Sequence, residues 1–343
     1  MEVIKPFLQG TFTMKKRILL TITLALLFMS IALLALSYRA QKKQIKGAVD
    51  QKLILLGKYY DGLAEHEAYE LGSTIKAIMQ SRDIKEAFKR GDRDLLLKLS
   101  KPLFSELQPR EITHFYFTGP GRINILRVHN PERFGDSINR KTTLIAEITG
   151  KESSGMELGP FGTFTLRVVA PWFDEGKLIG YLELGKEVEH AVEELRNFLD
   201  VQAYAFIHKK YISRGGWEEG LEMLSRKAQW DRFLSSVNIG EPIDALPKKA
   251  LEFLSDEKLA KGSKSIDFQM NGHMYRTGYL PLLDVNDIEV GHISVMIDIS
   301  DAVSAFYRHL LLVGAICILA AIIIQLVSYL MLSKFEKELK STY

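Results

Sequence analysis

Two long apolar runs, residues 18–38 and 310–333, bracket a segment in which apolar and polar positions alternate at shorter periods. Each run exceeds the ~18–20 apolar residues that a helix needs to cross a hydrocarbon core about 30 Å thick. The pattern predicts two transmembrane helices, with the segment between them on one side of the membrane and both termini on the other. A cleaved signal peptide is the alternative for the first run, but such peptides carry only ~7–15 apolar residues, which favours an uncleaved anchor. Within the second run, Gln325 is predicted to contact the other span.

After the first run, residues 41–90 show apolar residues at helical spacing, mostly three or four apart. The pattern predicts a long helix that rises from the membrane. Four glycines lie in it, and each weakens a helix by about 1 kcal/mol relative to alanine, so they mark candidate breaks unless tight packing needs them. These are Gly47, Gly57, Gly62 and Gly72. A second helix is predicted over residues 93–107, ended by Pro109.

The next stretch changes to β-branched and aromatic residues separated by turn residues, which is typical of an antiparallel sheet. The predicted elements are, in order, strands 112–118 and 122–129, a loop 130–136, a short helix 139–149, and a hairpin of strands 163–171 and 177–185. Two strands, a loop with a helix, and a hairpin follow the plan of a PAS-like unit.

The hairpin of this unit recurs about 110 residues later, which predicts a second unit of like fold. The positions that recur in register are Pro171 with Pro281, Asp174 with Asp284, and Gly180 with Gly291. The second unit is predicted to open with strand 202–208 and to carry helical insertions over 217–227 and 246–258.

The predicted fold class is α+β, with two tandem PAS-like antiparallel sheets on a long N-terminal helix, flanked by two transmembrane helices. The predicted boundaries are a cytoplasmic N-terminus 1–17, transmembrane helix 18–38, long helix and second helix 41–110, membrane-distal unit 111–187, membrane-proximal unit 188–300, transmembrane helix 310–333 and a short cytoplasmic tail 334–343.

Basic residues flank both apolar runs on the side of the termini. They are Lys15, Lys16 and Arg17 before the first run, and Lys334, Lys337 and Lys340 after the second. Positive flanks stay in the cytoplasm, so the chain is predicted to lie in the inner (plasma) membrane with both termini inside and the large segment outside. The formal net charge of +3 is too small to indicate a nucleic-acid partner. The single cysteine, Cys317, lies in the second run, so no disulfide is expected in the outer segment.

Three motifs of the first unit carry a resemblance to a known family. They are Phe115-Tyr-Phe117, Ile125-Leu-Arg-Val-His-Asn-Pro131 and Phe134-Gly-Asp136. With the two spans and the tandem sheets, they resemble double Cache domains, the extracytoplasmic sensors of bacterial chemoreceptors, histidine kinases and diguanylate cyclases. The likeness covers residues 112–185 well and 201–299 loosely. It implies small-molecule sensing in the distal unit, transmission along the helices, and a homodimer.

Arg127 and His129 share parity on one predicted strand, so their side chains point to the same face. On a pocket-lining face, Arg127 could grip a carboxylate with two hydrogen bonds, and His129 could donate another. The alternative places Arg127 on the solvent face, paired with Asp136 or Glu157. Arg167, on a different strand, is either a second cation for the ligand or a partner in a cross-strand ion pair.

Four further residues complete the candidate ligand site. Tyr116 lies on the opposite face of its strand from Phe115 and Phe117, and its hydroxyl is either a ligand donor or a satisfied core group. Asp136 is expected to cap the turn before the short helix. Arg140 is expected to reach the pocket mouth, with Phe134 packed over it.

Catalytic signatures are lacking, and His66-Glu67 has no second histidine at metalloprotease spacing. We expect no enzyme activity, no catalytic residue, no metal site and no cofactor. The leading hypothesis is a membrane-anchored sensor for a small polar or anionic metabolite. Its output domain is expected in a separate cytoplasmic signalling protein, since the chain encodes none after the second run and would be a split or truncated receptor. The alternative hypothesis is an anchored module that binds a protein partner.

Overall fold

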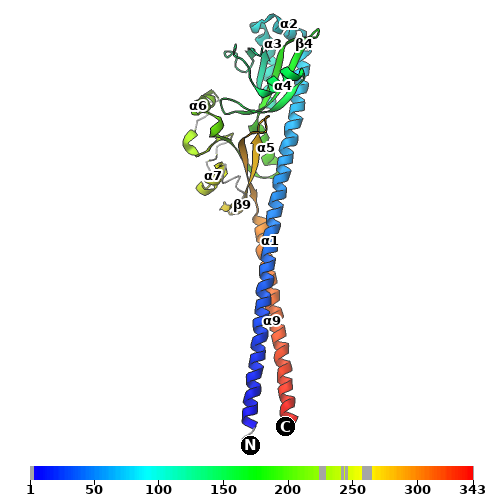
Figure 1. The fold of residues 1–343 in the computed structure, drawn as a ribbon, viewed down its shortest axis with the longest axis vertical. Helices are drawn as coiled ribbons and strands as arrows, with labels where there is room; N and C mark the ends of the chain where they lie inside the picture. The colour runs from blue at the N-terminus through cyan, green and yellow to red at the C-terminus, as the bar shows by residue number, and fades with distance from the viewer. Residues whose placement is uncertain (1–3, 224–228, 241–242, 244–245, 257–264, 343) are drawn as a thin grey trace. The chain divides into compact units, whose positions relative to one another are not determined.

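The computed structural model describes residues 4–223, 229–240, 243, 246–256 and 265–342. Its chain divides into two compact units. One joins the N-terminal residues up to Asp50 with those from Ile299 onward, and the other is Gln51–Asp298. Figure 1 shows the helices and strands of both. Each unit is described by itself below.

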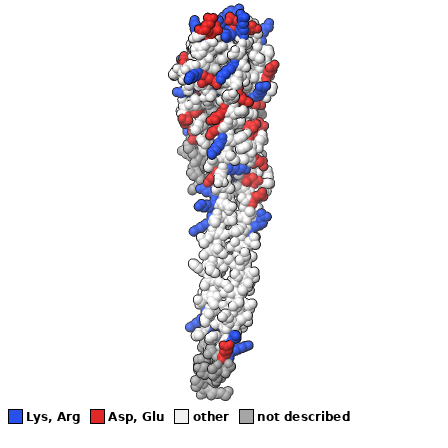
Figure 2. Space-filling view, turned by 90° about the vertical axis from the view of Figure 1, so that its right-hand side faces the viewer, with Lys and Arg blue, Asp and Glu red and all other residues white. Residues whose placement is uncertain are grey.

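The first unit consists of the N-terminal part of helix α1 (Ile4–Met79) and helix α9 (Ser300–Thr342). Both helices are long and apolar enough to cross a membrane, with mean hydropathy of 2.7 and 3.0 over their most apolar windows. Figure 2 shows a belt of surface without charged side chains, with basic side chains at both of its ends. The amide of Gln325 donates to the carbonyl of Leu19 at 3.2 Å and to Thr23, which confirms the predicted contact between the apolar runs.

Helix α1 continues without a break to Met79, so none of its glycines marks a break, which was one of the two possibilities left open by the sequence. Close packing is found at one of them, since a Cβ on Gly72 would meet the carboxylate of Glu152 at 2.5 Å, whereas a Cβ on Gly57 would make only an ordinary contact with Leu280. The break falls instead before Ser81, whose hydroxyl caps the next helix by accepting from the amide of Ile84. Helices α2 (Arg82–Arg90) and α3 (Arg93–Leu107) follow, the latter with the predicted bounds.

The first sheet of the second unit is antiparallel, in the order β2-β1-β5-β4-β3. Its strands are β1 (Ile112–Thr118), β2 (Asn124–Arg127), β3 (Ser153–Leu158), β4 (Phe164–Asp174) and β5 (Lys177–Glu187). One face packs on α1, α2 and α3 through buried residues such as Phe115, Phe117, Val168 and Leu184. Helix α4 (Lys141–Thr149) packs on β3 and β4. Alternation along the strands turns a set of charged side chains to the face opposite the apolar core.

The second sheet repeats this order as β7-β6-β10-β9-β8. Its strands are β6 (Gln202–His208), β7 (Ser236–Ile239), β8 (Asp267–Met270), β9 (His273–Leu283) and β10 (Glu289–Asp298). Among the described residues the remaining helices are α5 (Val188–Leu199), α6 (Arg214–Met223) and α7 (Lys248–Ser255), with short 3-10 turns η1 (Gln108–Arg110), η2 (Lys209–Tyr211) and η3 (Trp230–Arg232). Residues 224–227 and 257–258 of the two predicted insertions lie outside the described residues.

The two hairpins have equivalent registers, which confirms the α+β fold of two tandem sheets. Pro171 pairs with Tyr181, the residue after Gly180, and Pro281 pairs with His292, the residue after Gly291. Strands β3 and β8 were not predicted, because each is short and lacks a run of β-branched residues.

The repeated glycines, Gly180 on β5 and Gly291 on β10, allow each of these strands to approach a neighbouring strand closely. A Cβ on Gly180, which has φ of 149°, would collide with the carbonyl oxygen of Thr118, and one on Gly291 with that of Phe206. We expect Gly180→Ala and Gly291→Ala each to lower the free energy of unfolding by at least about 2 kcal/mol. Urea denaturation of the chain in detergent measures this.

The matched control is Gly121→Ala, because nothing lies within 4 Å of a Cβ at that position. It is expected to change the free energy of unfolding by less than about 0.5 kcal/mol. Equal effects at Gly121 and Gly180 would contradict a steric role for the repeated glycines.

Candidate functional site

Arg127, at the end of β2, forms a two-pronged ion pair with Asp136. Its guanidinium nitrogens Nη1 and Nη2 donate to Oδ1 and Oδ2 of Asp136, both at 2.7 Å. The arginine side chain is 5% exposed, whereas that of Asp136 is 45% exposed. Hydrogen bonding from Arg127 lowers the pKa of Asp136 below its usual range. A buried cation is therefore neutralised by a carboxylate that stands at the surface.

Arg140 and Arg167 share a different carboxylate, that of Glu183 on β5. Nη1 of Arg140 and Nη1 of Arg167 lie 2.9 and 2.5 Å from its Oε1. The side chains of Glu183 and Arg167 are each only 2% exposed. Burial alone would raise the pKa of Glu183, but the two guanidinium charges hold it below its ordinary value. The Glu183–Arg167 pair is therefore closed to solvent, whereas the side chain of Arg140 is 21% exposed.

Tyr116 on β1 lies at the centre of these cations. The guanidinium carbons of Arg140, Arg127 and Arg167 lie 4.8, 5.2 and 5.9 Å from the centroid of its ring. Its hydroxyl accepts a hydrogen bond from Nη2 of Arg140 at 3.1 Å. Because the ring face is electronegative, Tyr116 helps to hold like charges close together.

Two histidines border the ring of Tyr116. The imidazole of His129 lies 4.9 Å from both the Tyr116 and the His114 rings, and its Nδ1 accepts from the amide of Phe115 at 3.3 Å. Burial lowers the pKa of His129 to about 4. Burial also holds the pKa of His114 well below its ordinary value. Both imidazoles are therefore neutral near pH 7.

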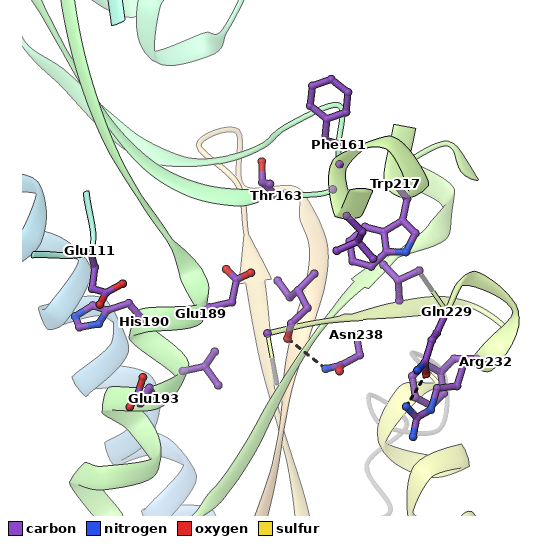
Figure 3. Close-up of a pocket in the computed structure, with 18 of the residues that line it drawn as sticks. Glu111, Phe161, Thr163, Glu189, His190, Glu193, Trp217, Gln229, Arg232 and Asn238 are labelled. Carbon is purple, nitrogen blue, oxygen red and sulfur yellow. Dashed lines mark hydrogen bonds between the residues drawn. The ribbon is translucent and has the colours of Figure 1, made fainter. Parts of the chain in front are cut away.

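A separate cavity of about 630 Å³ lies between the two sheets, and we call it the junction cavity (Figure 3). Its wall is formed by α5, by the loop between β3 and β4 of the first sheet, by α6 and η3, and by β7 of the second sheet. The residues that line it include Glu111, Phe161, Glu189, Glu193, Trp217 and Arg232. None of them was among the predicted site residues.

Comparison with protein families matches residues 56–303 to the double Cache model dCache_3, described as a double sensory domain of two-component sensor kinases. The chain belongs to this double Cache family. No curated protein matches the chain.

Solved structures similar to this double Cache chain include the periplasmic domain of Vibrio cholerae LuxQ, at 10% identity and a TM-score of 0.44, covering 72% of this chain and 98% of that one. The sensor domain of the V. cholerae histidine kinase DctB is 10% identical, with a TM-score of 0.42 and coverage of 75% and 98%. The ligand-binding domain of the Pseudomonas fluorescens chemoreceptor CtaA, solved with L-isoleucine, is 13% identical, with a TM-score of 0.38 and coverage of 77% and 98%.

In this double Cache chain, most of the predicted site residues come together. Tyr116, Arg127, His129, Arg140 and Arg167 form one group, which we call the Tyr116 cluster together with their carboxylate partners Asp136, Glu157 and Glu183. Asp136 stands at its rim as the partner of Arg127.

Phe134 lies outside the Tyr116 cluster. Its side chain is 55% exposed, and the guanidinium of Arg93 lies 3.9 Å from its ring centroid. The sequence interpretation missed Glu183, although an acid between Leu182 and Leu184 in a predicted buried strand is a signal for a paired buried charge.

Proposed function

We propose that this chain is a membrane-anchored extracytoplasmic sensor whose Tyr116 cluster binds a small anionic metabolite. The membership of the double Cache family supports the sensor role, and the two apolar helices support the anchor. One observation carries the site assignment: the buried cation Arg127 is paired with a carboxylate, Asp136, that is nearly half exposed. The carboxylate of such a partner returns to water when it leaves, and the cost falls on the buried Arg127, which a ligand carboxylate would neutralise again; Glu183 has no such access to water.

Charge balance determines which ligand this site would accept. Counting Asp136, the Tyr116 cluster holds three guanidinium groups and three carboxylates. Departure of Asp136 leaves one positive charge without compensation on Arg127. A ligand carboxylate has the planar two-oxygen geometry that Asp136 now presents, and it would restore neutrality. The protein's own aspartate thus acts as a competitor for the ligand.

Contacts of α1 provide a route from the Tyr116 cluster towards the membrane. Leu71 and Ile75 of α1 are buried in the core beneath the first sheet. Glu67 of α1 accepts from Lys186 on β5 at 2.9 Å, three residues beyond Glu183. In this proposal, ligand binding shifts β5 and α1, and the transmembrane helices of a homodimer pass the change to a separate cytoplasmic signalling protein.

The test is a thermal-shift screen of the full chain in detergent against small carboxylates. A ligand present at a hundred times its Kd stabilises the folded state by about 2.7 kcal/mol, which corresponds to a rise of several degrees in Tm. Arg127→Ala is expected to remove this stabilisation. Asp136→Asn is expected to tighten binding, because it neutralises the internal competitor while leaving the cation in place.

Arg110→Ala is the matched control, since Arg110 is exposed. A ligand whose binding survives Arg127→Ala would overturn the site assignment. A chain that binds no small molecule but captures a protein partner would support the interaction-module hypothesis instead.

A further inference from the structure

Asn124 is the first residue of β2, the strand that ends at Arg127, and it is only 1% exposed. Its backbone is held by the loop that carries Asp136. The Asn124 amide donates to the carbonyl of Asp136 at 2.8 Å, and the Asn124 carbonyl accepts from the amide of Gly135 at 2.9 Å. Asn124 also pairs with Thr118 of β1. The sheet and the loop together therefore fix its place beside Arg127.

The side-chain amide of Asn124 has a buried donor without an acceptor. Its Oδ1 accepts from Nη1 of Arg127 at 3.3 Å, and because a guanidinium group can only donate, this contact identifies the oxygen end of the amide. The other end is the donor Nδ2, which has no hydrogen-bond partner in the part of the chain that the structure describes. Such buried donors are uncommon, because they lose their hydrogen bonds to water.

This unpartnered donor belongs to the same group of contacts as the Arg127–Asp136 ion pair. Nη1 of Arg127 donates both to Oδ1 of Asn124 and to Oδ1 of Asp136, at 3.3 and 2.7 Å. The side chains of Asn124 and Asp136 thus lie against one guanidinium nitrogen. A ligand carboxylate that replaced Asp136 on Arg127 would lie next to the amide of Asn124.

Asp136 does not satisfy the Asn124 donor. Both of its carboxylate oxygens accept from Arg127, and neither accepts from Nδ2 of Asn124. The carbon next to the Asp136 carboxylate is a methylene, which carries no acceptor. An acid with an oxygen atom on that carbon would make the same two bonds to Arg127 and would add an acceptor for Asn124. This additional hydrogen bond would favour such an acid over the protein's own aspartate.

The backbone of the loop around Asp136 is held independently of the Asp136 side chain. Nη1 of Arg127 donates to the carbonyl of Arg133 at 2.7 Å, and the amide of Ile138 donates to the carbonyl of Arg122 at 2.8 Å. Exchange of Asp136 for a ligand therefore requires rotation of one side chain, and the loop keeps its path. Asn124, which is bonded to that loop, keeps its place as well.

We propose that the ligand of the Tyr116 cluster is a 2-hydroxycarboxylate or a 2-oxocarboxylate, and that Asn124 selects it by donating from Nδ2 to the oxygen on the second carbon. This inference rests on the proposed anion site, since the ligand carboxylate takes the place of Asp136 on Arg127. A site with a buried donor discriminates against an analogue that lacks the acceptor, because the donor then stays unpaired.

The test compares acids that differ only at or next to the second carbon. The full chain in detergent is titrated by calorimetry with two series, propanoate and butanedioate, each as the plain, the 2-hydroxy and the 2-oxo acid. The control ligand is 3-hydroxypropanoate, which carries its oxygen one carbon further away. In at least one series we expect a 2-hydroxy or 2-oxo acid to bind about tenfold or more tightly than the plain acid. The control should bind no more tightly than propanoate.

The variant Asn124→Ala removes the donor. It is expected to weaken binding of the preferred acid about tenfold, to the affinity of the plain acid, while the plain acid changes less than about twofold. The ratio of the two affinities isolates the hydrogen bond, because a disturbed Arg127 would weaken both acids alike. Asn139→Ala is the matched control and should leave the ratio unchanged, since Asn139 is exposed and accepts from Arg122 in the same loop.

Two results would overturn the role of Asn124 and leave the anion site in place. One is equal affinity for the plain, 2-hydroxy and 2-oxo acids when Arg127→Ala abolishes the binding of all of them. The other is a preference that survives Asn124→Ala. If no 2-hydroxy or 2-oxo acid binds up to about 10 mM, the inference also fails, and any other carboxylate that binds through Arg127 in the thermal-shift screen would still support the anion site. Circular dichroism confirms that each variant is folded.

Discussion

Replacement of Glu183 by alanine is expected to lower the free energy of unfolding by about 3–5 kcal/mol, the usual effect of removing one partner from a buried ion pair. Glu183 is the carboxylate shared by Arg140 and Arg167, and it is 2% exposed. Without it, two guanidinium groups next to Tyr116 lose their counter-charge, and that of Arg167 is only 2% exposed. A loss of this size is a large share of the stability of most domains.

Urea unfolding followed by Trp172 measures the effect of Glu183→Ala, because Trp172 is buried in the core of the first sheet. Trp217 and Trp230 are replaced by Phe in all chains compared, so that the signal comes from this core alone. Glu175→Gln, in the exposed turn between β4 and β5, is the control and is expected to change the free energy by less than about 0.5 kcal/mol. A loss below about 1 kcal/mol for Glu183→Ala would show that water reaches the Glu183–Arg167 pair, which is closed to solvent in the structure.

Local patterns in the sequence were sufficient to predict much of the fold. Helix α3 and strands β1 and β6 have the predicted bounds, because each combines a clear period with turn or capping residues at its ends. The hairpin repeat predicted two like sheets. Its prolines occupy equivalent register positions, and at each repeated glycine a Cβ would collide with a carbonyl oxygen of the neighbouring strand. The end of α1 could not be predicted in the same way. One of its glycines, Gly72, lies against Glu152 far along the chain, and that packing is not visible in the local pattern.

The composition of the Tyr116 cluster was only partly predictable. Strand parity indicated that Arg127 and His129 point to the same face, and both lie beside Tyr116, although β2 ends at Arg127 and His129 lies in the turn after it rather than in the predicted strand 122–129. Their carboxylate partners depend on which strands are neighbours: Glu183 comes from β5, which pairs with β1 across more than sixty residues of chain. The junction cavity was beyond prediction, because its walls come from segments far apart in the chain, whose contact depends on α6 fitting the β3–β4 loop.

Acidification is expected to destabilise the first sheet through its buried histidines. The folded pKa of His129 is about 4, because burial disfavours the charged imidazole, whereas an exposed histidine titrates near ~6.5. Between these two values the unfolded chain binds a proton that the folded chain does not. The free energy of unfolding therefore falls as the pH drops below about 6.5, and the loss is complete near pH 4. For a shift of this size the total is about 3 kcal/mol.

Two other buried groups near His129, namely His114 and Glu157, also change the free energy of unfolding as the pH falls. Burial also depresses the pKa of His114, and nearby Arg167 acts in the same direction, so this residue adds to the acid sensitivity. Glu157 has the opposite sign: burial raises its folded pKa, so the folded chain takes up a proton there first and gains stability as the pH falls towards the ordinary carboxyl range. The two buried histidines and Glu157 therefore change the stability in opposite directions as the pH falls.

The variant His129→Asn isolates the contribution of this imidazole, because the asparagine oxygen can still accept from the amide of Phe115. In urea unfolding at pH 7.5 and pH 5.0, the unmodified chain is expected to lose about 2 kcal/mol of stability from His129 alone on acidification. The His129→Asn chain should lose that much less, while His66→Asn, an exposed control on α1, should behave as the unmodified chain does. Equal losses in the His129→Asn and unmodified chains would mean that His129 is protonated as readily in the folded state as in water. In that case a charged imidazole would lie beside three guanidinium groups, and the anion site of the Tyr116 cluster would carry one more positive charge than its geometry indicates.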